Sequence, residues 1–184
     1  MRRVVLSVLM MILMLSSTCS NQSEDASQAA DQSVRQTGSE LDTSQIRLQK
    51  ATAGDVLEVV QESDASVKMV NVWATWFQPC REEFPDLLEL RENYNDQGFE
   101  LIFVSADFEG ELPQVKQFLA EHHVDFTTYM KTGKDMKFIN TLHDEWSGAL
   151  PATLVFGPEG RLQDFWQGKA DYAKLESAIK PYIQ

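Results

Sequence analysis

The stretch Asn71-Val-Trp-Ala-Thr-Trp-Phe-Gln-Pro-Cys-Arg-Glu-Glu-Phe-Pro85 decides the fold, because it joins a strand pattern to a helix pattern. Residues 67–73 (VKMVNVW) are mostly apolar and β-branched, which is typical of a buried central strand. Phe84 and Leu87 then follow helical spacing. Pro79 falls in the first helical turn, where its missing N–H had no intrahelical partner. The stretch therefore predicts a strand, a turn and a helix.

Outward from this stretch, strand and helix patterns alternate from about residue 46 to the end of the chain. The expected strands cover residues 46–50, 67–73, 100–106, 125–129, 152–157 and 161–167. One expected helix begins after a capping box at Thr52 and Asp55, and a second is the helix of the quoted stretch. Three more are expected over residues 111–123, 133–143 and 171–183. Alternation first and a hairpin last predict an α/β fold with a mixed sheet covered by helices.

The composition narrows the class of protein. The 184 residues are 43% apolar and 24% charged, which excludes a disordered chain and fits one domain with extensions. Sixteen basic against 28 acidic residues give a net charge of −12, which argues against nucleic-acid binding. Cys19 and Cys80 are too few for a disulfide framework or a thiolate zinc site. His122, His123 and His143 show no metal-ligand spacing, so we expect no metal and read them as surface residues.

The N-terminus has the pattern of an export signal. Arg2 and Arg3 precede an apolar run over residues 4–15, and small residues follow it. Twelve helical residues span about 18 Å, less than the ~30 Å hydrocarbon core, which disfavours a permanent membrane helix. Residues 1–19 are therefore predicted to be a signal peptide.

Cys19, which follows the small residues after this run, resembles the lipobox cysteine of bacterial lipoproteins. The resemblance implies lipidation of Cys19, and Ser20 after it resembles an outer-membrane sorting signal. Ordinary cleavage nearby, with loss of Cys19, is the alternative. Residues 20–45 contain almost no large apolar side chain and are predicted to be a flexible tether, which leaves 46–184 as the folded domain. We therefore expect a periplasmic protein, anchored to the membrane through lipid.

The quoted stretch resembles the motif N-x-W-A-x-W-C-x-P-C-x-x-E-x-P of TlpA-like exported thiol-disulfide oxidoreductases, a branch of the thioredoxin fold. The likeness extends from about residue 50 to the C-terminus and includes Leu150-Pro-Ala-Thr153. It implies a thioredoxin-like fold, a central mixed sheet flanked by helices, and no cofactor. Phe77 stands where this family has its first cysteine. Because phenylalanine cannot form a disulfide, turnover through an internal dithiol is excluded.

Cys80, which matches the second cysteine of the family, has three interpretations. It is a small buried hydrophobe, as free cysteines often are. Alternatively, it is a functional thiol that forms mixed disulfides with a partner. The third interpretation is peroxidase chemistry, because peroxiredoxins resemble this fold. They carry threonine three residues before their reactive cysteine, where this chain has Phe77.

Glu83 matches the family glutamate, to which the resemblance gives an acid–base role beside the cysteines. At i, i+3 from Cys80 it could face the thiol, where its charge would raise the thiol pKa. The alternative is a solvated helix carboxylate. Asn71 is usual for the TlpA-like branch and offers no proton relay.

A candidate peptide groove combines aromatic and proline residues of both motifs. Its predicted residues are Trp76, Phe77, Pro79, Leu150 and Pro151. The resemblance implies a cis peptide bond before Pro151, with the backbone of the preceding residue free to pair with an extended peptide. Trp73 is expected in the core and Trp76 on the surface. We therefore expect a non-turnover module that binds a peptide or protein of the cell envelope. The alternative is a monothiol oxidoreductase or peroxidase that uses Cys80, and the oligomeric state stays open.

Overall fold

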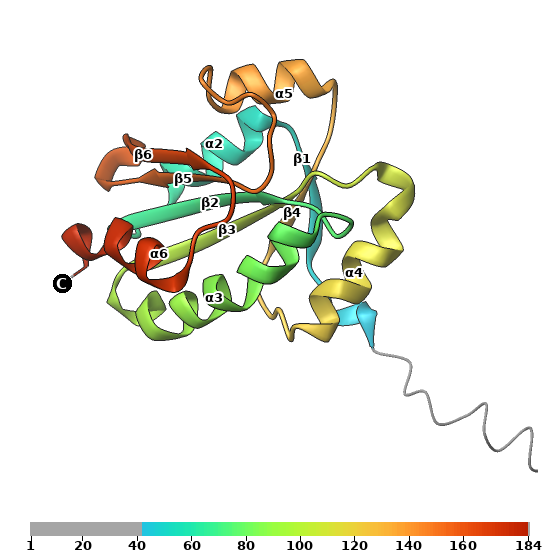
Figure 1. Ribbon diagram of the computed structural model, residues 1–184, viewed down its shortest axis with the longest axis horizontal. Coiled ribbons are helices and arrows are strands. Elements are labelled where there is room, and N and C mark those ends of the chain that lie inside the picture. The colour runs from blue at the N-terminus through green and yellow to red at the C-terminus, as the bar shows by residue number, and fades with distance from the viewer. Residues whose placement is uncertain (1–41, 184) are drawn as a thin grey trace, which may run out of the picture. The chain divides into compact units, whose positions relative to one another are not determined.

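The computed structural model describes residues 42–183, which form a six-stranded mixed sheet between two layers of helices (Figure 1). The predicted signal peptide, Cys19 and residues 20–41 of the predicted tether lie outside the described residues, and these predictions stay predictions. The strands are β1 (Leu48–Ala51), β2 (Val67–Trp73), β3 (Phe99–Ser105), β4 (Thr128–Lys131), β5 (Ala152–Phe156) and β6 (Leu162–Gln167).

The sheet order is β1-β4-β3-β2-β5-β6. The pairs β1–β4, β4–β3 and β3–β2 are parallel, whereas β5 is antiparallel to both β2 and β6. The predicted mixed sheet and the final hairpin are therefore confirmed. Because β2 and β3 are parallel neighbours, their carboxyl ends lie side by side at one edge of the sheet, which is a common place for functional loops.

Helices cover both faces of the sheet. They are α2 (Ala53–Glu62), α3 (Gln78–Tyr94), α4 (Leu112–Glu121), α5 (Asp135–Leu142) and α6 (Tyr172–Ile179). In Figure 1, α2 and α5 lie on one face, and α3 and α6 lie on the other. Two buried clusters match these layers, one beneath α2 and α5 and one beneath α3, α4 and α6. No helix among residues 42–183 has the length and apolarity to cross a membrane.

Local sequence signals explain most of the element boundaries. The predicted capping box is confirmed: the Asp55 N–H donates to the Thr52 hydroxyl at 3.3 Å, and the Thr52 N–H donates to the Asp55 carboxylate at 2.8 Å. The last helix, predicted to reach residue 183, ends at Ile179 and continues as a 3₁₀ turn over Lys180–Tyr182. Pro181 in that turn has no N–H to continue the α-helical ladder.

The strand predicted at residues 125–129 lies two to three residues later, at Thr128–Lys131. This segment forms a strand because it pairs along its whole length with Leu48–Ala51 of β1. With β3 it pairs only through Tyr129 and Met130. The chain before Thr128 therefore runs apart from β3.

The core beneath α3 and α4 is aromatic. Trp73, at the end of β2, is fully buried, as predicted. Its ring lies 4.9 Å from that of Phe84, and the Phe84 ring stacks on Phe103 at 4.4 Å. This packing fixes the start of α3 against the carboxyl ends of β2 and β3.

Candidate functional site

A buried carboxylate holds the loop between β2 and α3. Asp107 follows β3 and is almost fully buried. It accepts hydrogen bonds from the Thr75 N–H at 3.1 Å, from the Thr75 hydroxyl, and from the Ser105 hydroxyl at 2.7 Å. The Ala106 N–H also donates to the Trp73 carbonyl at 2.7 Å. The loops after β2 and β3 are thus joined at the base of the candidate site.

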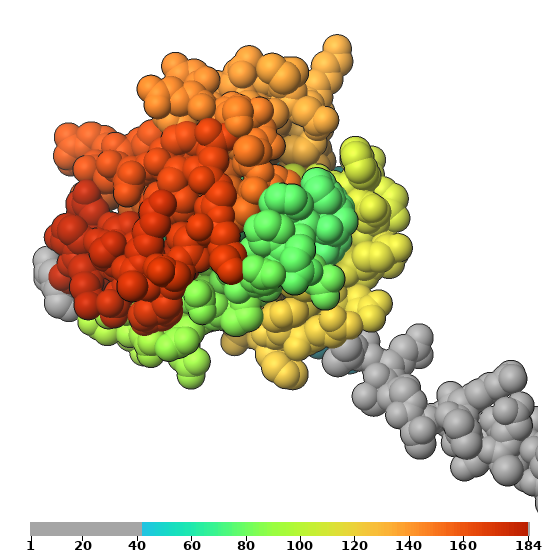
Figure 2. Space-filling view, viewed as in Figure 1, coloured from blue at the N-terminus to red at the C-terminus, as the bar shows by residue number. Residues whose placement is uncertain are grey.

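Phe77 begins α3 as its N-cap residue, without a side-chain cap hydrogen bond. Its carbonyl accepts from the N–H groups of Cys80 at 3.1 Å and Arg81 at 3.3 Å, and Pro79 lies in the first turn, as predicted. The neighbouring Trp76 is 57% exposed, which confirms its surface position, and its ring contacts Phe77 at 5.8 Å between centroids. The start of α3 and the loop before it form the green surface between the red and yellow regions of Figure 2.

Cys80 lies inside the protein, not at its surface. Its side chain is 1% exposed, in the cluster that contains Trp73 and Phe84. Burial raises the pKa of the Cys80 thiol to about 12, with smaller contributions from the negative charges of Glu83 and Asp107. The hydrogen bond at the Ala74 backbone lowers the pKa but does not offset burial. The structure therefore encloses the Cys80 sulfur and favours its protonated form.

Glu83 is completely buried, so its interpretation as a solvated helix carboxylate was wrong. The segment before α6 covers it, and the Ala170 N–H donates to Glu83 Oε1 at 3.1 Å. Glu83 Oε2 has no hydrogen-bond partner among the described residues. Burial raises the pKa of Glu83 to about 7, against smaller lowering effects from Ala170 and Asn71. Asn71 itself donates through Nδ2 to the Thr153 hydroxyl at 3.1 Å.

We predict that this buried carboxyl makes folding pH-dependent. Because the folded state raises the pKa of Glu83 above its ordinary value of 4.5, the folded state binds the proton more tightly. The contribution of Glu83 to stability is therefore complete below about pH 4.5, and about 3 kcal/mol is lost as the pH rises through about 7. Urea unfolding across this range should show the loss in the wild type and not in Glu83→Gln. The control is Glu82→Gln, whose exposed carboxylate pairs with Lys169 and should leave the loss in place. Equal pH profiles for wild type and Glu83→Gln would contradict this assignment.

The second motif lies against the same buried cluster. The Leu150–Pro151 peptide bond is cis, as the resemblance implied. Phe77 and Leu150, both partly buried, pack against the cluster that contains Cys80. The Pro151 carbonyl accepts from the Gly168 N–H at 2.8 Å, whereas no hydrogen bond among residues 42–183 uses the backbone of Leu150. The backbone groups immediately before the cis-proline thus make no hydrogen bond within residues 42–183.

Two residues at the carboxyl edge of the sheet were not predicted as site residues from the sequence. The only sequence signal for Asp107 is its position just after a buried strand, which is common for acidic residues. Phe108, the next residue, is 70% exposed and is the most exposed large apolar side chain of the described domain. Of the three histidines expected at the surface, His123 is exposed, whereas His122 and His143 are partly buried, with their rings 4.2 Å from Phe118 and 4.4 Å from Phe165. Among residues 42–183, no group of three His, Cys, Asp or Glu side chains is arranged to hold a metal ion.

A family model described as the AhpC/TSA family matches residues 44–165, more than half of the chain. The chain belongs to the AhpC/TSA family. Among family relatives, the thiol-disulfide oxidoreductase ResA of Oceanobacillus iheyensis is 31% identical over 122 residues, covering 65% of this chain and 60% of ResA. The thioredoxin-like protein YneN of Bacillus subtilis is 28% identical over 123 residues, covering 65% of this chain and 67% of YneN.

The solved structures similar to this AhpC/TSA-family domain include a thiol:disulfide interchange protein of the thioredoxin family from Chlorobium tepidum TLS. The match has a TM-score of 0.57 and 21% identity, and it covers 69% of this chain and 84% of that protein. At this identity the match supports the fold alone. Together with the family match, it confirms the thioredoxin-like fold and the TlpA-like family that the two motifs implied.

Proposed function

We propose that this domain binds an extended peptide or protein segment at the carboxyl edge of its sheet and does not turn over disulfides. The observation that carries the proposal is the state of Cys80, which is 1% exposed with a pKa of about 12. A thiol must reach a substrate as thiolate to attack a disulfide, and this one is both enclosed and protonated. Phe77, at the helix start where related enzymes are inferred to hold their attacking cysteine, has no nucleophile.

The proposed binding surface is the groove predicted from the sequence: Trp76, Phe77, Pro79, Leu150 and Pro151. Trp76 offers an exposed ring, and the unused backbone groups of Leu150 suit pairing with an extended peptide. Loss of the first cysteine leaves these features in place. The same enclosure of Cys80 argues against the monothiol oxidoreductase and the peroxidase, because both require an accessible sulfur.

We also propose that the domain acts outside the cytoplasm. The arginine-led apolar run over residues 4–15 supports export, and a solved structural neighbour is described as a secreted thiol-disulfide isomerase from Corynebacterium glutamicum. Lipidation of Cys19 would attach the domain to the outer membrane and place the groove near partners of the cell envelope. The intact mass of membrane-extracted protein tests this, because acylation adds mass and ordinary cleavage removes Cys19.

Binding without sulfur chemistry can be tested with a polypeptide that has no free thiol. We expect insulin B chain with carboxymethylated cysteines to bind wild type and Cys80→Ser equally. Trp76→Ala should bind at least about fivefold more weakly, because exposed tryptophans are common anchors of interfaces. Calorimetric titration measures the three dissociation constants.

The matched control is Met136→Ala, which removes another exposed large apolar side chain, on α5 and away from the groove. Binding of the B chain should be unchanged in this variant. The proposal fails if Cys80→Ser abolishes binding, or if Trp76→Ala and Met136→Ala behave alike.

A further inference from the structure

The sheet contains a gap between two of its inner strands. β3 pairs with β2 from Phe99 to Ser105, but with β4 only through Val104 and Ser105. From Phe99 to Ile102, β3 therefore has no strand partner on the side of β4. Alternate N–H and C=O groups of β3 point to that side, and buried backbone groups of this kind need a hydrogen-bond partner.

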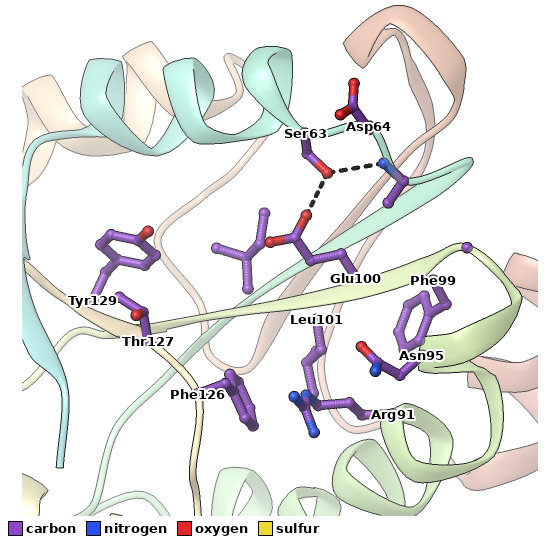
Figure 3. A pocket seen from close by; sticks show the side chains of 13 residues that line it. Ser63, Asp64, Arg91, Asn95, Phe99, Glu100, Leu101, Phe126, Thr127 and Tyr129 are labelled. Atoms are coloured by element: carbon purple, nitrogen blue, oxygen red, sulfur yellow. Dashed lines mark hydrogen bonds between the residues drawn. The ribbon is translucent and has the colours of Figure 1, made fainter. Parts of the chain in front are cut away.

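A cavity of about 510 Å³ lies along this open edge (Figure 3). Its walls come from the segment after α2, the last turn of α3, the open part of β3, and the chain just before β4. The lining residues used below are Ser63, Asp64, Arg91, Glu100, Leu101, Phe126 and Tyr129. The gap lies toward the amino end of β3, whereas Trp76 and Phe77 follow the carboxyl end of β2.

The two sides of the gap differ in chemistry. In Figure 3, Glu100 and Leu101 point to opposite sides of the β3 ribbon, as successive strand residues do. Glu100 points toward Ser63, whose hydroxyl donates to Glu100 Oε2. Leu101 points toward Phe126 and Arg91. A strand lying along β3 would therefore meet a carboxylate with one side chain and an apolar and aromatic wall with the next.

The polar side of the gap carries the carboxylate of Glu100. The cross-strand neighbour of Glu100 on β2 is the buried Lys68, whose ammonium donates to the Ala65 and Gly157 carbonyls at 3.1 Å. Glu100 Oε1 has no hydrogen-bond partner among the described residues, and no lysine or arginine there pairs with it. Asp64 adds a second, exposed carboxylate. Arg91 is engaged elsewhere, with its guanidinium 4.1 Å above the Phe126 ring and Nη1 3.7 Å from Asp125 Oδ1. Burial and, to a smaller extent, the nearby charge of Glu100 raise the pKa of the Tyr129 hydroxyl.

We propose that this gap binds a short extended peptide segment of a basic partner, which pairs with the open edge of β3. A lysine or arginine of the segment meets Glu100, and the adjacent apolar side chain packs on Leu101 and Phe126. Strand addition supplies the affinity through main-chain hydrogen bonds, and the alternating walls supply the specificity. The net charge of −12 also favours a basic partner over a second copy of this chain.

The test uses two capped peptides, acetyl-Val-Lys-Val-Val-amide and acetyl-Val-Glu-Val-Val-amide, with the full chain. We expect saturable binding of the lysine peptide, with chemical-shift changes at the amides of residues 99–102 and 126–129. Glu100→Gln, which keeps the acceptor for Ser63, should weaken this binding about tenfold. Glu100→Lys should reverse the preference between the two peptides, and N-methylation of the lysine peptide backbone should abolish binding.

Trp76→Ala is the control that distinguishes binding at this gap from binding at the carboxyl-edge groove. This variant should bind the lysine peptide as the wild type does. Circular dichroism of each variant establishes that it is folded. The proposal would be overturned if Glu100→Lys still preferred the lysine peptide to the glutamate peptide. It would also be overturned by shift changes confined to the amides around Trp76, a result that would still be compatible with the proposed function.

Discussion

Iodoacetamide should alkylate Cys80 about a thousandfold more slowly in the folded protein than in the unfolded chain at the same pH. The reacting species is the thiolate, and burial raises the thiol pKa from its ordinary 9.0 to about 12. Each pKa unit lowers the thiolate fraction about tenfold at pH values below both pKa values. Enclosure of the sulfur slows the reaction further. Mass spectrometry of the Cys80 peptide after timed quenching measures the two rates.

The unfolded reference is the same protein in concentrated urea, where the thiol should regain its ordinary reactivity. Comparing rates at several pH values separates the pKa effect from simple enclosure, because only the pKa effect moves the pH midpoint of the reaction. Rapid alkylation of the folded protein near pH 6 would show a reactive thiolate and would contradict the proposed non-turnover function.

Phe77→Cys should reduce insulin, with dithiothreitol as electron donor, well above the level of the wild type. A cysteine at this N-cap would stand beside uncapped helix N–H groups and the positive end of the α3 dipole, which favour thiolate. It would also lie three residues before Cys80, whose sulfur could then resolve the mixed disulfide. The turbidity of precipitating insulin B chain measures the gain over the wild type.

Two variants control for unspecific effects of the new residue. Phe77→Ser introduces a small polar N-cap without sulfur, and Phe77→Cys combined with Cys80→Ser supplies an attacking thiol without its resolving partner. Both should lack turnover. Absence of activity in Phe77→Cys itself, with the variant folded, would mean that the groove or the helix start has diverged beyond the one missing cysteine.

The sequence predicts the fold of residues 46–183 well, because its signals are local and strong. The apolar run of β2 and the capping box of α2 each determine their own segment. The strand before α5 was misplaced because its position depends on pairing with β1, about 80 residues away. A run of residues such as Asp125–Lys131 does not reveal from its own composition where a distant partner strand will lie.

The candidate site was predicted less completely, for a similar reason. The residues of the proposed groove could be named from the sequence because they belong to two recognisable motifs. The burial of Glu83 depends on Ala170, 87 residues later, and no helical periodicity around Glu83 reveals that cover. Asp107 was missed because a single acidic residue after a strand is common, and only the tertiary structure shows that it holds Thr75.

The hydrogen bonds between Thr75 and Asp107 also bear on how the proposed groove would meet a partner. They fix the backbone next to two exposed aromatic residues, because Trp76 follows Thr75 and Phe108 follows Asp107. A surface that is preorganised in this way loses little conformational entropy on association, so more of the contact energy appears as affinity. The domain should consequently act as a rigid template. A flexible ligand would adapt to it, and the backbone of the domain would change little.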